Sequence, residues 1–156
     1  MGMTKGDLAR EYFLNGYNCA QSVACAFADR TGLPVETAAR MASGFGGGVG
    51  RLREVCGCVC GMVLVYSLLH GYPAPGPREE KAAFYGEIQV LADRFRAGAG
   101  GSIVCRELLG LARPEGTPMP EERTPAYYQK RPCPALAKLA GDVLEQFLKE
   151  KEAELP

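Results

Sequence analysis

One stretch of the sequence, residues 55–69, constrains the fold most because it is apolar on all of its faces. A helix without a polar face is stable only when other elements cover it. The stretch is fifteen residues long, shorter than the roughly 20 residues that a membrane-spanning helix needs. Its valines would also fit a pair of strands, but its leucines and Met62 favour a helix and no turn signal interrupts it. We therefore predict a buried central helix over residues 53–69.

Amphipathic patterns predict the helices that surround this central one. Apolar residues recur every three or four positions within residues 136–148 and within 78–97, which is the period of a helix with one buried face. Shorter helices are expected over residues 7–14, 18–30, 35–42 and 102–110. Two proline-rich segments, 71–77 and 114–132, are expected to be loops. The sequence thus predicts one all-α domain over residues 1–156, a bundle of six to seven helices.

The charge balance excludes two classes of partner. Lysines and arginines number 18, as do aspartates and glutamates, so nothing in the charge favours nucleic acid or an anionic membrane surface. The N-terminus lacks the apolar region of a secretory signal. We expect a cytoplasmic protein that binds neither nucleic acid nor membrane; a monomer and a homodimer both stay open.

Cysteines are unusually frequent for such a protein. The chain has seven: Cys19, Cys25, Cys56, Cys58, Cys60, Cys105 and Cys133. An odd number in a chain without a secretory signal argues against a disulfide framework. In a reducing compartment, clustered cysteines more often bind a metal or carry out redox chemistry. The alternative for any single cysteine is a structural role, since a free thiol packs like a small hydrophobic side chain.

Four cysteines from four separate segments fall at predicted helix N-termini: Cys19, Cys56, Cys105 and Cys133. Three of these starts are marked by Asn18, Ser102 and Pro134, residue types that favour the first positions of a helix. Unpaired N–H groups and the helix dipole stabilise an anion there, and the thiolate is the reactive form of cysteine. We therefore predict that these four are the catalytic residues and that they converge in space.

The other three cysteines are weaker candidates. If residues 56–60 are helical, Cys60 lies on the same face as Cys56 and could join the site, whereas Cys58 points nearly opposite and packs elsewhere. Cys25 is more than one turn beyond Cys19 and is expected in the core.

Five short motifs in order resemble the C_GCAxxG_C_C family: GYNCAQ at 16–21, GFGGGVGR at 44–51, CGCVCG at 56–61, CRELLG at 105–110 and CP at 133–134. The resemblance implies redox activity carried by four hallmark cysteines, which fall on Cys19, Cys56, Cys105 and Cys133. The central family motif is Cys-Gly-Ala-x-x-Gly. This chain departs from it, because Cys58 replaces the alanine and Cys60 fills a variable position.

Two functions compete on these residues. The first is thiol–disulfide exchange, which would make the protein an oxidoreductase whose partner is a redox protein or a small thiol. Arg51 and Arg53 could stabilise a thiolate at Cys56 in that case. The second is a zinc or iron–sulfur site, with ligands from Cys19, Cys56, Cys60, Cys105 and Cys133.

The glycine-rich segment 44–50 raises a third hypothesis, phosphate binding by a loop before a helix. It follows a predicted helix instead of a strand and lacks the Gly-Lys-Ser/Thr signature. The glycines more plausibly let the backbone turn tightly and approach the cysteines.

Overall fold

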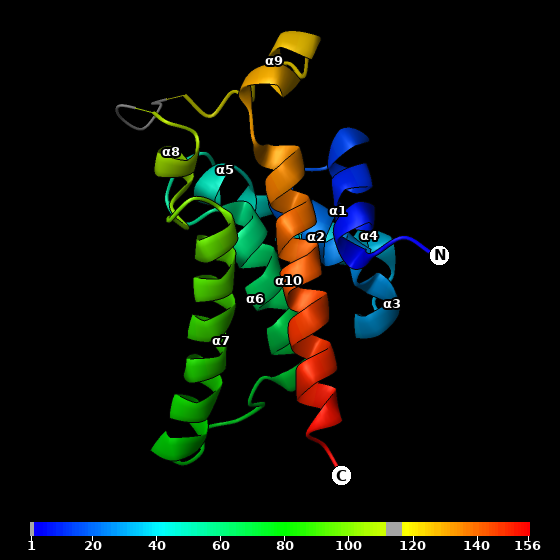
Figure 1. Cartoon of the computed structure of the whole chain (residues 1–156), viewed down its shortest axis with the longest axis vertical. Helices are drawn as coiled ribbons and strands as arrows, with labels where there is room; N and C mark the ends of the chain where they lie inside the picture. Colours follow the sequence, from blue (N-terminus) through cyan, green and yellow to red (C-terminus); the bar gives the residue numbers. More distant parts are fainter. Residues whose placement is uncertain (1, 112–116) are drawn as a thin grey trace.

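The computed structural model describes residues 2–111 and 117–156, and its regular elements are helical (Figure 1). The elements are α1 (Lys5–Leu14), α2 (Cys19–Ala26), α3 (Ala28–Thr31), α4 (Val35–Ala42), the 3-10 turn η1 (Ser43–Phe45), α5 (Gly46–Val49), α6 (Gly57–His70), α7 (Arg78–Gly98), α8 (Cys105–Leu108), α9 (Pro125–Lys130) and α10 (Cys133–Ala153). Within the described residues there is no strand, which confirms the predicted all-α class.

The predicted helices are present but several differ in extent, and the helix expected over 102–110 is only the four residues of α8. The helix expected over 18–30 is interrupted at Phe27, whose ψ of 15° separates α2 from α3. The central helix begins at Gly57 instead of residue 53, because Arg53 has a left-handed backbone with φ of 60° and Val55 pairs with Val104 in an isolated antiparallel bridge. The proline-rich loop contains the short helix α9; its residues 114–116 lie outside the described part of the chain.

Helix α6 occupies the middle of the bundle, in contact with α2, α7 and α10. Tyr66 is its largest fully buried side chain. Its ring lies 5.8 Å from that of Phe84 on α7 and 5.4 Å from that of Phe147 on α10, measured between centroids. The apolar sequence of α6 is thus explained by partners on several sides.

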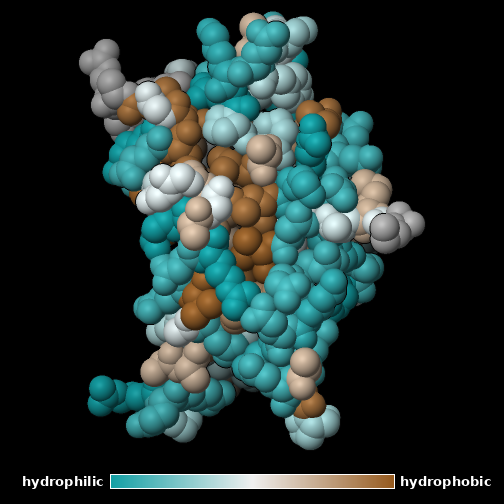
Figure 2. Space-filling model, viewed as in Figure 1, coloured by the Kyte–Doolittle hydropathy of each residue, from teal (hydrophilic) through white to brown (hydrophobic). Residues whose placement is uncertain are grey.

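Cover over α6 is incomplete on one side. The space-filling view in Figure 2 shows hydrophobic residues in a stripe between α7 and α10. Leu68 of α6 is 46% exposed. Among the described helices, none is long and apolar enough to cross a lipid bilayer.

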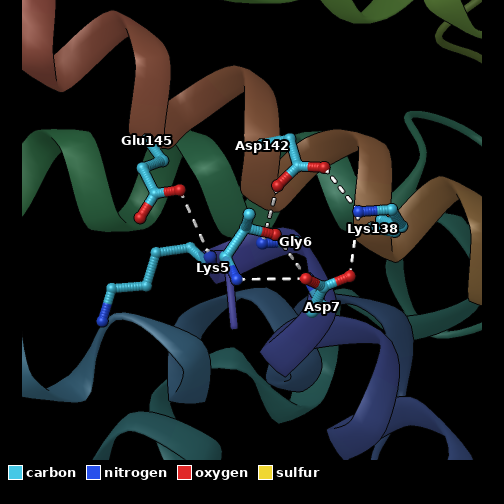
Figure 3. A network of polar contacts seen from close by, with 7 residues as sticks. Lys5, Gly6, Asp7, Lys138, Asp142 and Glu145 are labelled. Carbon is cyan, nitrogen blue, oxygen red and sulfur yellow. Dashed lines mark hydrogen bonds and ion pairs between the residues drawn. The ribbon is translucent and has the colours of Figure 1, made fainter. Parts of the chain in front are cut away.

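Helices α1 and α10 cross in close contact at two glycines. A Cβ atom on Gly141 would lie 2.6 Å from the Cα of Gly6. Figure 3 shows the polar contacts that surround this crossing: Asp142 accepts a hydrogen bond from the backbone N–H of Gly6 at 3.1 Å, and Lys138 contacts both Asp142 and Asp7. Acidic groups at the start of α1 also suit its helix dipole.

We predict that Gly141→Ala lowers the free energy of unfolding by about 1–3 kcal/mol, because the added methyl group overlaps backbone atoms of α1. The matched control is Gly86→Ala within α7, where a Cβ meets nothing within 4 Å. That control should raise stability by about 0.5–1 kcal/mol through helix propensity. Urea denaturation measures both, and equal stability of the two variants would contradict the tight crossing.

Candidate functional site

The described residues surround a cavity of about 410 Å³ whose lining includes five cysteines: Cys19, Cys56, Cys58, Cys105 and Cys133. The four cysteines expected to converge therefore do face one space. Cys25 and Cys60 are not part of the lining. All seven thiols are free in this structure.

Each of the four predicted cysteines lies at the start of a helix. Cys19 is the first residue of α2, Cys105 of α8 and Cys133 of α10, while Cys56 is the N-cap of α6. At α2 the cap is Asn18, whose side chain accepts a hydrogen bond from the N–H of Gln21 at 2.9 Å. The Asn18 signal is confirmed, whereas α8 begins after Val104 without the expected Ser102 cap, and Pro134 is the second residue of α10 instead of the first.

A short antiparallel pairing brings Cys56 and Cys105 to the same place. The N–H of Cys56 donates to the carbonyl of Ile103 at 2.8 Å, and the N–H of Cys105 donates to the carbonyl of Glu54 at 2.6 Å. The bridge between Val55 and Val104 lies between these two bonds. These backbone hydrogen bonds therefore hold the segment before α6 against the segment before α8.

The glycine-rich loop contains a run of left-handed residues. From Gly47 to Arg51 the φ angles lie between 57° and 69°, and the run includes the β-branched Val49. Left-handed conformation costs about 1–2 kcal/mol for a residue with a side chain. A Cβ on Gly48 would lie 2.6 Å from the Cβ of Cys105, so this loop does approach the cysteines as expected.

Cys19 has the surroundings of a stabilised thiolate. Its sulfur interacts with the Cys58 thiol and with the backbone N–H groups of Gly47 and Ala20, and these hydrogen bonds lower the pKa of Cys19 to about 6 in spite of burial. Glycine is required at position 57, because a Cβ there would overlap the Cys19 sulfur and approach the carbonyl oxygen of Phe45 to 2.8 Å.

Cys58 was expected to pack away from the site, and this expectation was wrong. It hydrogen-bonds with both Cys19 and Cys56. The physical reason is the start of α6: Cys56 is the cap and not a residue inside the helix, so helical spacing from Cys56 does not give the direction of Cys58. These two hydrogen bonds and burial hold the pKa of Cys58 well above its usual range, which keeps the proton on Cys58.

Cys60, which was expected to share a face with Cys56, lies outside the cavity lining for the same reason. Its sulfur is 4.0 Å from the carbonyl oxygen of Val55, and burial raises its pKa to about 11. Cys25 is 2% exposed and belongs to the core, as expected.

Two further cysteines of the cavity, Cys105 and Cys133, are protonated at neutral pH. Burial raises the pKa of Cys133 to about 12. Burial also raises the pKa of Cys105, although the Arg53 guanidinium lies 3.6 Å from its sulfur and acts in the opposite direction. Arg53 was expected to stabilise a thiolate at Cys56, and in the structure its guanidinium contacts the sulfur of Cys105.

Several residues of the cavity were missed by sequence reasoning. They come mainly from the proline-rich segment and α9: Pro118, Pro120, Glu121, Arg123, Tyr127 and Arg131. The signal that could have found them is the proximity of Arg123 and Arg131 in sequence to Cys133. Glu54, by contrast, is exposed and pairs with Arg106, so it is a solvated acid.

A preformed metal site is not found in the described part of the chain. No group of three or more histidine, cysteine, aspartate or glutamate side chains is arranged there to hold a metal ion. Of the five cysteines expected as ligands for zinc or a cluster, Cys60 does not line the cavity with the other four. The thiols as placed therefore do not fit the metal hypothesis.

We predict that alkylation of Cys19 follows a titration with a midpoint near pH 6, because only the thiolate reacts and its pKa is about 6. The rate should be constant above the midpoint and fall tenfold per pH unit below it. Iodoacetamide labelling with peptide mass spectrometry measures this, with Cys60 as the internal control, since its pKa of about 11 should keep it slow up to pH 9. A Cys19 midpoint above pH 8 would refute the stabilised thiolate.

A second prediction concerns Gly57. Gly57→Ala should raise the pKa of Cys19, because the methyl group displaces its sulfur from the N–H groups of Gly47 and Ala20. Gly44→Ala is the control in the same region, where a Cβ meets nothing within 4 Å. The same labelling experiment checks both variants, and an unchanged Cys19 midpoint in Gly57→Ala would show that the close approach is unimportant.

Comparison with known proteins agrees with this arrangement. A family model described as "Putative redox-active protein (C_GCAxxG_C_C)" matches residues 17–147. That range includes all four helix-start cysteines and the glycine-rich loop. Searches of curated proteins and of solved structures found no match. Because the family model covers most of the chain, the protein belongs to the C_GCAxxG_C_C family.

Proposed function

We propose that this protein carries out thiol–disulfide exchange, with Cys19 as the attacking thiolate and Cys58 as the resolving thiol. One observation carries the proposal: Cys19 and Cys58 line the same cavity, and the Cys19 sulfur lies against the start of α6 at Gly57. Hydrogen bonds from the Cys58 thiol and from backbone N–H groups lower the pKa of Cys19 to about 6. Membership of a redox-active family supports the same class of chemistry.

The two sulfurs have complementary protonation states. The pKa of Cys19 is lowered to about 6 and that of Cys58 is raised, so at neutral pH one is a nucleophile and the other holds a proton. A thiolate attacks a disulfide to form a mixed disulfide, and a second thiol then attacks that intermediate. Cys58 is in position for the second step because it already contacts Cys19.

The other cysteines of the predicted catalytic set have different parts in this proposal. Cys56 hydrogen-bonds with Cys58. It is therefore placed to attack the Cys58 sulfur of a Cys19–Cys58 disulfide, which would form a Cys56–Cys58 bond and release Cys19 as a thiolate. Cys105 and Cys133 line the cavity as protonated thiols and are therefore weaker nucleophiles than Cys19 at neutral pH. Their participation stays a prediction.

The electron partner is proposed to be a small thiol or disulfide, or a redox protein. A reducing compartment such as the cytoplasm would return the oxidised site to the dithiol.

We predict that mild oxidation lowers the free-thiol count by two and that peptide mapping finds a disulfide between Cys19 and Cys58. Cys19→Ser should prevent this disulfide, and Cys58→Ser should accumulate a mixed disulfide on Cys19. Cys60→Ser is the matched control and should behave as the parent protein, because Cys60 lies outside the cavity.

The same preparation tests the metal hypothesis. Protein purified without oxygen should contain no stoichiometric zinc or iron. One equivalent of zinc, or iron with sulfide, lost on mutation of Cys19 would replace this proposal by metal binding.

A further inference from the structure

We infer that Asn18 and Gln21 are positioning residues for Cys19, because their side-chain amides hold the end of α4 and the turn after it against the start of α2. That turn carries a backbone N–H group to the Cys19 sulfur. The inference rests on the role of Cys19 as the attacking thiolate proposed above. The two amides act on the sulfur through the backbone that they bind.

Asn18 and Gln21 form the capping box of α2. The side-chain oxygen of Asn18 accepts a hydrogen bond from the backbone N–H of Gln21 at 2.9 Å. The side-chain oxygen of Gln21 accepts one from the backbone N–H of Asn18 at 3.0 Å. A capping box needs only these two acceptor oxygens. The NH₂ groups of both amides are therefore left for other partners.

The capping box of α1 shows that this chain also caps a helix without amides. There Thr4 and Asp7 supply the two acceptor oxygens. Neither side chain has an NH₂ group, whereas asparagine and glutamine each have one with two N–H donors. The amides at both positions of the α2 box therefore point to a second role that local capping does not require.

Both NH₂ groups donate to the end of α4. Nδ2 of Asn18 donates to the backbone carbonyl of Ser43 at 3.0 Å. Nε2 of Gln21 donates to the backbone carbonyl of Ala39 at 3.1 Å. The last carbonyls of a helix lack partners within it, and here the N–H of Ser43 donates to Arg40 instead of to Ala39. The capping box that begins α2 therefore also caps the end of α4.

The segment held by these amides leads directly to the thiolate. Ser43 begins η1, and Gly47 follows in α5. Asn18 packs against the turn between them, since a Cβ atom on Gly46 would lie 2.5 Å from its Nδ2. The N–H of Gly47 then donates to the sulfur of Cys19, the residue after Asn18. Loss of the amide contacts would let the turn move away from α2, and this donor would move with it.

Two uncharged variants remove these contacts and keep a cap on α2. Asn18→Ser retains an oxygen for the N–H of Gln21 but has no donor for the carbonyl of Ser43. Gln21→Met retains the backbone N–H that Asn18 caps but has no donor for the carbonyl of Ala39. We expect each variant to raise the pH midpoint of Cys19 labelling by about one unit, because the loss of a hydrogen bond to the thiolate favours its protonated form.

Thr4→Ala is the matched control. It removes the cap of α1, which destabilises a helix in a comparable way, but Thr4 does not line the cavity. The Cys19 midpoint should stay that of the parent protein. A second measurement uses NMR: the N–H resonance of Gly47 in the parent should shift as Cys19 titrates, and this shift should be smaller in both amide variants.

An unchanged labelling midpoint in either amide variant overturns the inference, and so does a Gly47 resonance in the parent that does not follow the Cys19 titration. An equal rise in Thr4→Ala would also contradict it, because a general loss of stability would then explain the shift. The proposed function fails separately. If mild oxidation of the parent forms no Cys19–Cys58 disulfide, the redox proposal is wrong, while labelling still decides the role of the two amides.

Discussion

The hydrogen bonds that converge on the sulfur of Cys19 depend on a backbone approach that only glycine allows. Gly57 lets the start of α6 lie against the sulfur, and Gly47 offers its N–H from the loop before that helix. Both contacts require α2, α5 and α6 to meet at one point. A side chain at position 57 would separate them, so the reactivity of Cys19 is a property of how three elements pack and not of its own sequence context alone.

This arrangement is costly for the backbone. Val49, Arg51 and Arg53 all have positive φ, and each such residue costs about 1–2 kcal/mol. Strained backbone of this kind persists where the surroundings hold it in place. Here the pairing of residues 53–56 with 103–106 and the burial of Arg53 supply that restraint. The strained loop in turn places Gly48 against Cys105. The residues with strained backbone therefore belong to the segment that forms part of the cysteine site.

Features of the fold and the site that depend on local sequence could be predicted, and features that depend on tertiary packing could not. The helices and the positions of Cys19 and Cys133 follow from local capping, proline placement and periodicity, which are visible in sequence, whereas no capping side chain marks the start of α8 at Cys105. The direction of Cys58 does not, because it depends on whether α6 begins before or after Cys56, and a shift of that start changes which face a side chain occupies. The left-handed turn was equally hidden, since valine and arginine rarely adopt positive φ. Arg123 and Arg131 come from a proline-rich segment without helical periodicity, so their place in the cavity depends on the fold.

The chemistry of the site follows from pKa values that its contacts push apart. One hydrogen bond between Cys19 and Cys58 lowers the pKa of the acceptor and raises that of the donor. Paired groups with separated pKa values can divide the work of attack and proton transfer. The family pattern has alanine where this chain has Cys58, so here a second thiol lies beside the reactive one. A thiolate with its partner already in contact has a short-lived mixed disulfide, because the resolving thiol does not need to be brought in by a conformational change. Both thiols that the proposed two-electron exchange requires therefore lie in one cavity of a single subunit.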